Sequence, residues 1–191
     1  MRKRMSIAYV ILALAVTFAR AGDPKVRKAN RFAAYQEQEG VTLTVSWQIA
    51  MHSNGDFLPL FIAVSNEGKG AAEVDLANFS LKDEEGDTYR PASYKDVLSA
   101  VGQLGKDKRL VRDLDYAGLN TRATLRTTPS SFYPHEEAAT QDGTTELMTR
   151  SQMFDFVYFQ IPDRVKHGKL TLVAEGIIDA PAFKVTFQIP K

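Results

Sequence analysis

The three histidines of the chain, His52, His135 and His167, are the side chains best suited to proton transfer near neutral pH. A histidine with a serine and an aspartate could form a hydrolytic triad, but no serine lies in the Gly-x-Ser-x-Gly context of a nucleophile elbow. The chain also lacks cysteine, which excludes thiolate catalysis, disulfide bonds and cysteine-ligated metals. The sequence therefore predicts no catalytic residues and a protein that is not an enzyme; a hydrolase remains a weaker alternative.

Copper is the sharpest metal hypothesis, because methionine and histidine ligands suit this metal in exported sandwich proteins. The candidate ligands are Met51, His52, His135, Met148 and Met153. No two of them fall at a recognisable ligand spacing, and Met148 and Met153 are equally suited to filling gaps in a core. We therefore predict no metal site and no cofactor.

Calcium is the second metal hypothesis, because four carboxylates crowd one turn. They are Asp83, Glu84, Glu85 and Asp87. Calcium prefers such oxygen ligands, but the stretch lacks the alternating ligand order and the length of an EF-hand loop. The favoured interpretation is the acidic tip of a hairpin.

A short aromatic cluster, Phe132-Tyr133-Pro134-His135, lies among polar residues. Aromatic side chains on loops are common contact anchors for partners. The alternative, which we favour, is that Phe132 tucks under its loop and holds it against the domain.

The strands that must carry these side chains are visible as alternating or continuous apolar runs. Residues 41–50 alternate, with Val41, Leu43 and Val45 facing one side and the intervening polar residues the other. Residues 57–65 are typical of a central strand buried on both faces, with Pro59 expected near its start or beside a bulge. Three later strands are expected at residues 154–161, 170–174 and 183–189.

The middle of the chain is less regular. Residues 94–104 are predicted to form one short helix, with Ser93 as its N-cap and Gly105 just past its end. Candidate strands at residues 109–115 and 123–127 follow, and residues 130–152 have the composition of a long polar loop. The segment 94–152 is thus a long insertion, and residues 22–40 are predicted to be an N-terminal arm leading into a single domain of residues 41–191.

Short strands separated by turn residues, with one helix at most, are typical of a sandwich. We therefore predict an all-β, immunoglobulin-like β-sandwich with one short helix in a long insertion.

The first 21 residues have the pattern of a cleaved signal peptide. Arg2, Lys3 and Arg4 precede an apolar run at residues 7–18, and Ala19-Arg20-Ala21 supplies small residues for cleavage. A run of 12 residues is shorter than the roughly 20 that span a bilayer, so no permanent membrane anchor is expected. Removal of these four basic residues would leave 20 basic and 23 acidic side chains and a net charge of −3, which disfavours nucleic-acid binding.

Two segments carry a resemblance to a known family. They are Val64-Ser65-Asn66-Glu67-Gly68 with Phe79, Leu81, Asp83, Gly86 and Tyr89, and Phe159-Gln160-Ile161-Pro162-Asp163 with Gly168-Lys169-Leu170-Thr171-Leu172. This pattern resembles the telokin-like, immunoglobulin-like family of exported bacterial domains of unknown function. The resemblance implies a β-sandwich and supplies no catalytic residues. The chain departs from the family in having no lipobox cysteine and a longer segment between residues 94 and 152.

The residues that carry the resemblance have structural interpretations. Asn66 and Gly68 are expected to form a turn after a strand, Phe79 and Leu81 to fill core positions, and Asp83 with Gly86 to close a hairpin.

The predicted function is that of an exported, non-catalytic binding or structural module of the cell envelope, periplasmic or secreted, that mediates protein–protein interaction. The sheet edges and the 94–152 insertion are the candidate contact surfaces, and an envelope protein is the expected partner. The alternative is a periplasmic metal-binding or chaperone-like protein.

Overall fold

The computed structural model describes residues 25–51, 56–99, 124–130, 132–133 and 144–190. The predicted leader at residues 1–21 and the candidate strand at 109–115 lie outside the described residues.

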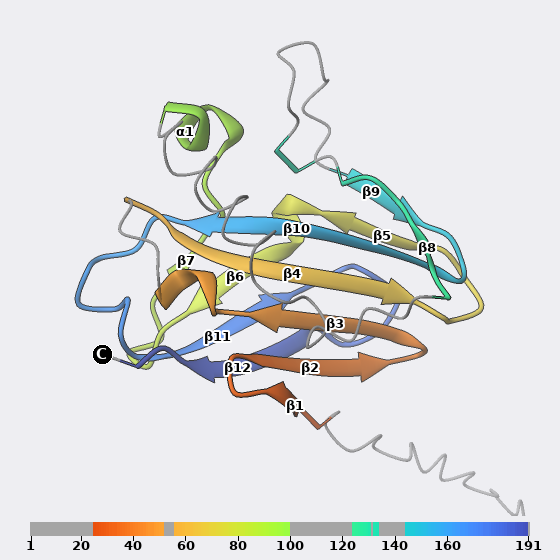
Figure 1. The fold of residues 1–191 in the computed structure, drawn as a ribbon, viewed down its shortest axis with the longest axis horizontal. Coiled ribbons are helices and arrows are strands. Elements are labelled where there is room, and N and C mark those ends of the chain that lie inside the picture. The colour runs from red at the N-terminus through yellow and green to blue at the C-terminus, as the bar shows by residue number, and fades with distance from the viewer. Residues whose placement is uncertain (1–24, 52–55, 100–123, 131, 134–143, 191) are drawn as a thin grey trace, which may run out of the picture.

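The regular structure of the described chain is mostly β-strand (Figure 1). A six-stranded sheet has the order β1 (Arg27–Asn30), β2 (Ala33–Gln38), β3 (Val41–Ser46), β4 (Leu58–Asn66), β10 (Ser151–Phe159) and β8 (Arg126–Thr127). A four-stranded sheet has the order β12 (Phe183–Gln188), β11 (Lys169–Ala174), β6 (Phe79–Lys82) and β7 (Thr88–Tyr89). The strands β5 (Ala72–Asp75) and β9 (Thr144–Leu147) form a separate pair. The helical elements are η1 (Ile49–Met51), η2 (Leu76–Asn78) and α1 (Tyr94–Ser99).

The two large sheets pack in a sandwich-like arrangement, and this confirms the predicted all-β sandwich with one short α-helix. Nearly all strand pairs of the described chain are antiparallel, and β8 joins β10 in parallel. Between the sheets, Trp47 stacks on Phe187 with ring centroids 5.0 Å apart. At one side β2 lies against β12, where the Gln36 side chain accepts a hydrogen bond from the Lys184 backbone N–H (Figure 1).

The central strands form where the sequence is most apolar. β4 pairs with β3 on one side and with β10 along its full length on the other, and eight of its nine residues are buried. Pro59 is the second residue of β4, so its missing N–H falls near the strand start as predicted. The strand β3 differs from the prediction, because Thr42, Thr44 and Ser46 are buried as well as the apolar face.

Residues 22–40 are not a simple arm leading into the domain, because residues 27–38 form the hairpin of β1 and β2 on the six-stranded sheet. The sequence Ala33–Gln38 has no strong strand pattern of its own, and its partner β3 supplies the ladder that orders it. The predicted loop 130–152 is wrong at its end, since Thr144–Leu147 is strand β9 and β10 already begins at Ser151.

The turn residues behind the family resemblance behave as expected. Phe79 and Leu81 are fully buried. The backbone N–H of Gly86 donates to the Asp83 carbonyl at 3.3 Å and closes the β6–β7 hairpin. The helix α1 begins after Ser93, whose Oγ accepts the Asp96 N–H at 3.2 Å, which confirms the predicted N-cap.

Candidate functional site

The edges of the two large sheets differ in how open they are to a partner. On the edge strand β12, the Lys184 backbone N–H already donates a hydrogen bond to the Gln36 side chain. The edge strands β7 and β8 are only two residues long. The strand β1 forms an edge of the six-stranded sheet (Figure 1). Three of its four residues are exposed. It therefore presents an open edge of the six-stranded sheet.

The β1 edge is strongly basic. The residues Lys25, Arg27, Lys28 and Arg31 lie within seven positions, and residues 25–36 contain no carboxylate. The guanidinium of Arg31 lies 4.4 Å from the Phe32 ring centroid. Ion pairs in the described chain are made by Arg164 and Lys166, not by these four cations. Their positive charge is thus available to a partner.

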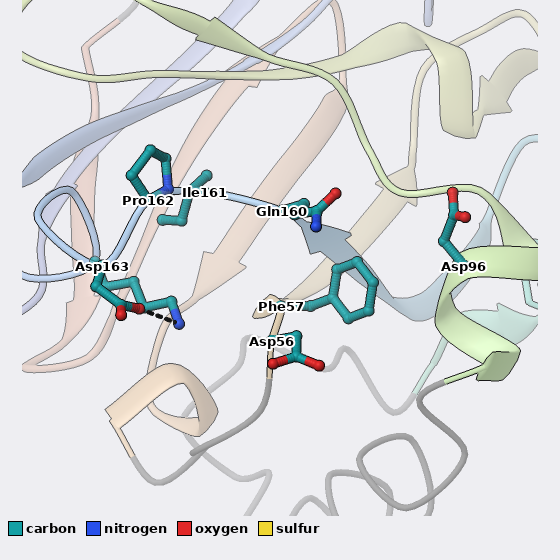
Figure 2. A pocket seen from close by; sticks show the side chains of 8 residues that line it. Asp56, Phe57, Asp96, Gln160, Ile161, Pro162 and Asp163 are labelled. Carbon is teal, nitrogen blue, oxygen red and sulfur yellow. Dashed lines mark ion pairs between the residues drawn. The ribbon is translucent and has the colours of Figure 1, made fainter.

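An open pocket of about 510 Å³ lies where α1 approaches the chain that leads into β4 and the chain that leaves β10. Its lining consists of Asp56, Phe57, Asp96, Gln160, Ile161, Pro162, Asp163 and Lys166. Figure 2 shows the Phe57 ring between the carboxylates of Asp56 and Asp96, with the Gln160 amide nearby. The Lys166 ammonium pairs with Asp163 at 2.8 Å, and this pairing holds the pKa of the Asp163 carboxyl below its usual value.

The acidic hairpin tip between β6 and β7 brings Asp83, Glu85 and Asp87 close enough to bind one cation. Two of these carboxylates already face a positive partner, since Arg164 lies 2.8 Å from Glu85 and 3.9 Å from Asp87. Asp83 accepts hydrogen bonds from the backbone N–H groups of Glu85 and Asp87 and from the Tyr89 hydroxyl. These bonds shape the turn, which agrees with the interpretation of a hairpin tip.

The candidate copper ligands occupy unlike environments where the structure describes them. Met153 is fully buried in the core, Met51 packs partly buried against it, and Met148 is 62% exposed. His52 and His135 lie outside the described residues. His167 is exposed, with Nδ1 3.1 Å from the Pro190 carbonyl oxygen.

The aromatic pair Phe132 and Tyr133 is buried, as the favoured interpretation predicted. Phe132 packs edge-on against Phe79 with centroids 5.8 Å apart. The Tyr133 hydroxyl donates to the Ala92 carbonyl at 3.1 Å and accepts from the Tyr158 N–H at 3.4 Å. Burial raises the pKa of Tyr133. These two side chains fasten their segment to the domain and are not available as contact anchors.

Sequence reasoning missed both the β1 edge and the pocket. The basic run before and within β1 is visible in the sequence, but its meaning depends on knowing that residues 27–30 form an edge strand. The pocket joins residues near positions 56, 96 and 163, and nothing local links them.

No family model and no curated protein matches the chain. Among solved structures, the crystal structure of the yjhA protein from Bacillus subtilis is similar with a TM-score of 0.43 and 13% sequence identity, covering 81% of this chain and 95% of that one.

Proposed function

We propose that this chain is an exported, non-catalytic binding module of the cell envelope that recognises a partner protein through the edge of β1. The observation that carries the proposal is the open, basic edge of the six-stranded sheet. A free edge offers backbone donors and acceptors to an extended segment, which can add to the sheet as a further strand.

The positive charge of this edge favours an acidic extended segment as the partner. Lys25, Arg27, Lys28 and Arg31 would face carboxylates, and complementary charge raises the association rate and disfavours wrong partners. Val26, directly before β1, is 40% exposed and adds an apolar contact. The net charge of −3 expected for the processed chain makes this basic edge a local feature rather than a general attraction to anions.

The export part of the proposal rests on the leader pattern of residues 1–21 and on the resemblance to exported telokin-like, immunoglobulin-like domains. A periplasmic or secreted location follows from that pattern. Among the described residues, no helix has the length and apolarity needed to cross a membrane.

A binding role is favoured over the metal-binding alternative by the contacts of the acidic hairpin. Arg164 already compensates Glu85 and Asp87, and the turn backbone occupies Asp83. A cation would have to compete with these contacts.

The test is capture from the native envelope. The full chain carrying a C-terminal tag is expressed in its own host, cross-linked, purified and analysed by mass spectrometry. We expect one reproducible partner protein, which is lost in the double variant Arg27→Glu/Lys28→Glu. The matched control Lys69→Glu/Lys82→Glu reverses the same number of exposed charges elsewhere and should retain the partner.

Two outcomes contradict the proposal. One is equal recovery of the partner by the edge variant and the control, which would move the contact surface away from β1. The other is recovery of no partner protein together with binding of the chain to anionic lipid vesicles, which would identify the basic edge as a membrane contact.

A further inference from the structure

We propose that the partner of the β1 edge is a second copy of this chain, which contributes the outward face of the β5–β9 pair. This inference deepens the proposed function and rests on it, because it names the acidic extended segment that β1 recognises. Two observations carry it: the complementary charge of the two surfaces, and an exposed apolar side chain beside each of them.

The β5–β9 pair has one buried face and one outward face. Its buried positions are Ala72, Val74, Thr145 and Leu147. On the outward face, Glu73 of β5 lies directly opposite Glu146 of β9, and both are exposed. The ion pairs of the described chain involve neither of these two carboxylates. Asp75 is not counted with them, because it already accepts hydrogen bonds from the Thr144 hydroxyl and the Ala77 N–H.

The facing pair Glu73 and Glu146 favours a positively charged partner. Residues directly opposite each other in an antiparallel ladder have Cβ atoms about 4.5–5.5 Å apart, and like charges at such positions destabilise the pair. A cationic surface laid over the two carboxylates would replace this repulsion by attraction. The β1 edge is such a surface, since residues 25–36 contain four cations and no carboxylate.

The exposed apolar side chains match this arrangement of charge. Among the described residues, the large hydrophobic side chains that are exposed are Val26, at 40%, and Met148, at 62%. Val26 directly precedes β1, and Met148 directly follows β9, two positions after Glu146. Because side chains two positions apart in extended chain point to the same side, Met148 continues the outward face. Each charged surface therefore has an apolar contact beside it, as interfaces between proteins commonly do.

The β1 edge and the β5–β9 pair of one chain are too far apart to contact each other. In the six-stranded sheet β2, β3 and β4 separate β1 from β10, and β9 leads into β10 through a short turn. Four strand spacings of about 4.8 Å place β1 about 19 Å from β10. Figure 1 shows β1 and β9 on opposite sides of the molecule. The complementary surface must therefore come from another copy.

A contact between two unlike surfaces determines the type of assembly. Every pair of copies leaves one β1 edge and one β5–β9 face unused, so further copies can be added. Such head-to-tail contacts form closed rings or open chains rather than a symmetric dimer.

The first test is the state of association of the full chain, purified from its own host with a C-terminal tag. Sedimentation velocity is measured over a range of protein concentrations at about 0.01 M and about 1 M salt, where the screening length falls from about 30 Å to about 3 Å. We expect assemblies larger than the monomer at low salt, and association at least about tenfold weaker at high salt.

Two variants reverse the charge of one surface each. They are Arg27→Glu/Lys28→Glu at the β1 edge and Glu73→Lys/Glu146→Lys on the β5–β9 face. Each variant alone should associate at least about tenfold more weakly than the parent chain, because like charges then face each other across the contact. An equal mixture of the two variants should recover association, because every contact between unlike variants pairs opposite charges. Recovery also shows that both variants are folded.

The matched controls reverse two exposed charges on other elements. Lys82→Glu/Lys169→Glu changes two lysines of the four-stranded sheet, and Asp56→Lys/Glu84→Lys changes two carboxylates. Asp56 precedes β4 and Glu84 lies in the β6–β7 hairpin, so both lie outside the β5–β9 pair. Both controls should associate as the parent chain does.

The inference is overturned if the parent chain stays monomeric at low salt, if either surface variant associates as the parent does, or if the mixture fails to recover association. These outcomes are distinct from a failure of the proposed function. A monomeric chain whose β1 edge still captures another envelope protein contradicts only this inference. Capture of a partner that survives Arg27→Glu/Lys28→Glu contradicts the proposed function itself.

Discussion

Asn66, the last residue of β4, connects two loops to the sheet through its buried side chain. Its Nδ2 donates to the carbonyls of Gly70 and Leu147, each at 2.8 Å, and its Oδ1 accepts from the Gly68 N–H at 2.9 Å. The side chain is fully buried and its bond to the Leu147 carbonyl is buried too, so water cannot readily replace that bond.

Replacing Asn66 with alanine should therefore lower the free energy of unfolding by about 3 kcal/mol, about 1 kcal/mol for each lost hydrogen bond. Urea denaturation of the two proteins measures this difference. The neighbouring variant Ser65→Ala, at a half-buried position, serves as the control and should change the stability much less. A loss below about 1 kcal/mol for Asn66→Ala would show that these contacts contribute little.

Tyr133 gives the fold a specific sensitivity to alkaline pH. Burial raises its pKa above the ordinary value of 10.0, so above pH 10.0 the unfolded chain loses a proton that the folded chain keeps. Its contribution to stability is complete below pH 10.0 and declines as the pH rises further, by up to about 1.4 kcal/mol per pH unit.

The variant Tyr133→Phe cannot titrate and should show a shallower decline of the unfolding free energy above pH 10.0. Denaturation measured in steps from pH 7 to 11 tests this. Parallel curves for the two proteins across that range would contradict the buried state of the hydroxyl.

The sequence could predict local roles but not distant contacts. Asn66 and Gly68 were expected to form a turn, and they do. The bond from Asn66 to Leu147 spans 81 positions and depends on how β5 and β9 pair beside β4. The pocket residues were missed for the same reason, since Asp56, Asp96 and Asp163 meet only after folding.

At the scale of elements, the β2–β3 turn and the loop after β4 pack backbone against backbone. Gly40 has φ of +79°, and a Cβ there would lie 2.8 Å from Gly68 Cα. A Cβ on Gly68 would lie 2.6 Å from the Glu39 carbonyl oxygen. This close approach accompanies the hydrogen bond of 2.8 Å from the Glu67 N–H to the Gly40 carbonyl.

Gly68→Ala should therefore destabilise the protein by about 1–3 kcal/mol, in the range of overpacked sites. Gly70→Ala, two residues away, meets nothing within 4 Å and should be neutral or slightly stabilising. Thermal unfolding of both variants measures the contrast. Equal melting temperatures would contradict the contact between the two turns.

The elements that the sequence predicted well are those with a strong apolar signal. Strands β4, β10, β11 and β12 fall where apolar runs occur. The strands β1, β2 and β9 were missed because their residues are small or polar and are ordered by their partners. The burial of the polar face of β3 was missed for a different reason. An alternating pattern of apolar and polar residues identifies the face that packs in the core, but it does not show whether other residues cover the opposite face.

At the scale of the whole molecule, the positive and negative surfaces belong to different elements. The basic cations gather before and along β1, and the acidic pocket lies beside α1. The all-β sandwich with one short helix was predictable from the sequence, and the immunoglobulin-like type stays a prediction. The order of strands in each sheet was not predictable, because pairing depends on long-range packing.

If the chain is exported, we expect its N-terminal leader to be removed. The protein recovered from the envelope or the medium should begin at Gly22, because residues 1–21 have the pattern of a cleaved leader. Intact-mass measurement of the tagged protein tests this. An intact Met1 terminus in the envelope fraction would contradict cleavage and indicate an uncleaved anchor.

The most direct test of the central claim is site-specific photo-cross-linking in living cells. A photoreactive residue replaces Val26, which is exposed and uncharged beside β1, or Thr186, which is exposed on the four-stranded sheet. We expect one cross-linked protein from position 26, none from position 186, and loss of the product with Arg27→Glu/Lys28→Glu. Cross-linking from position 186 alone, or from position 26 regardless of the charge reversal, would contradict recognition at the β1 edge.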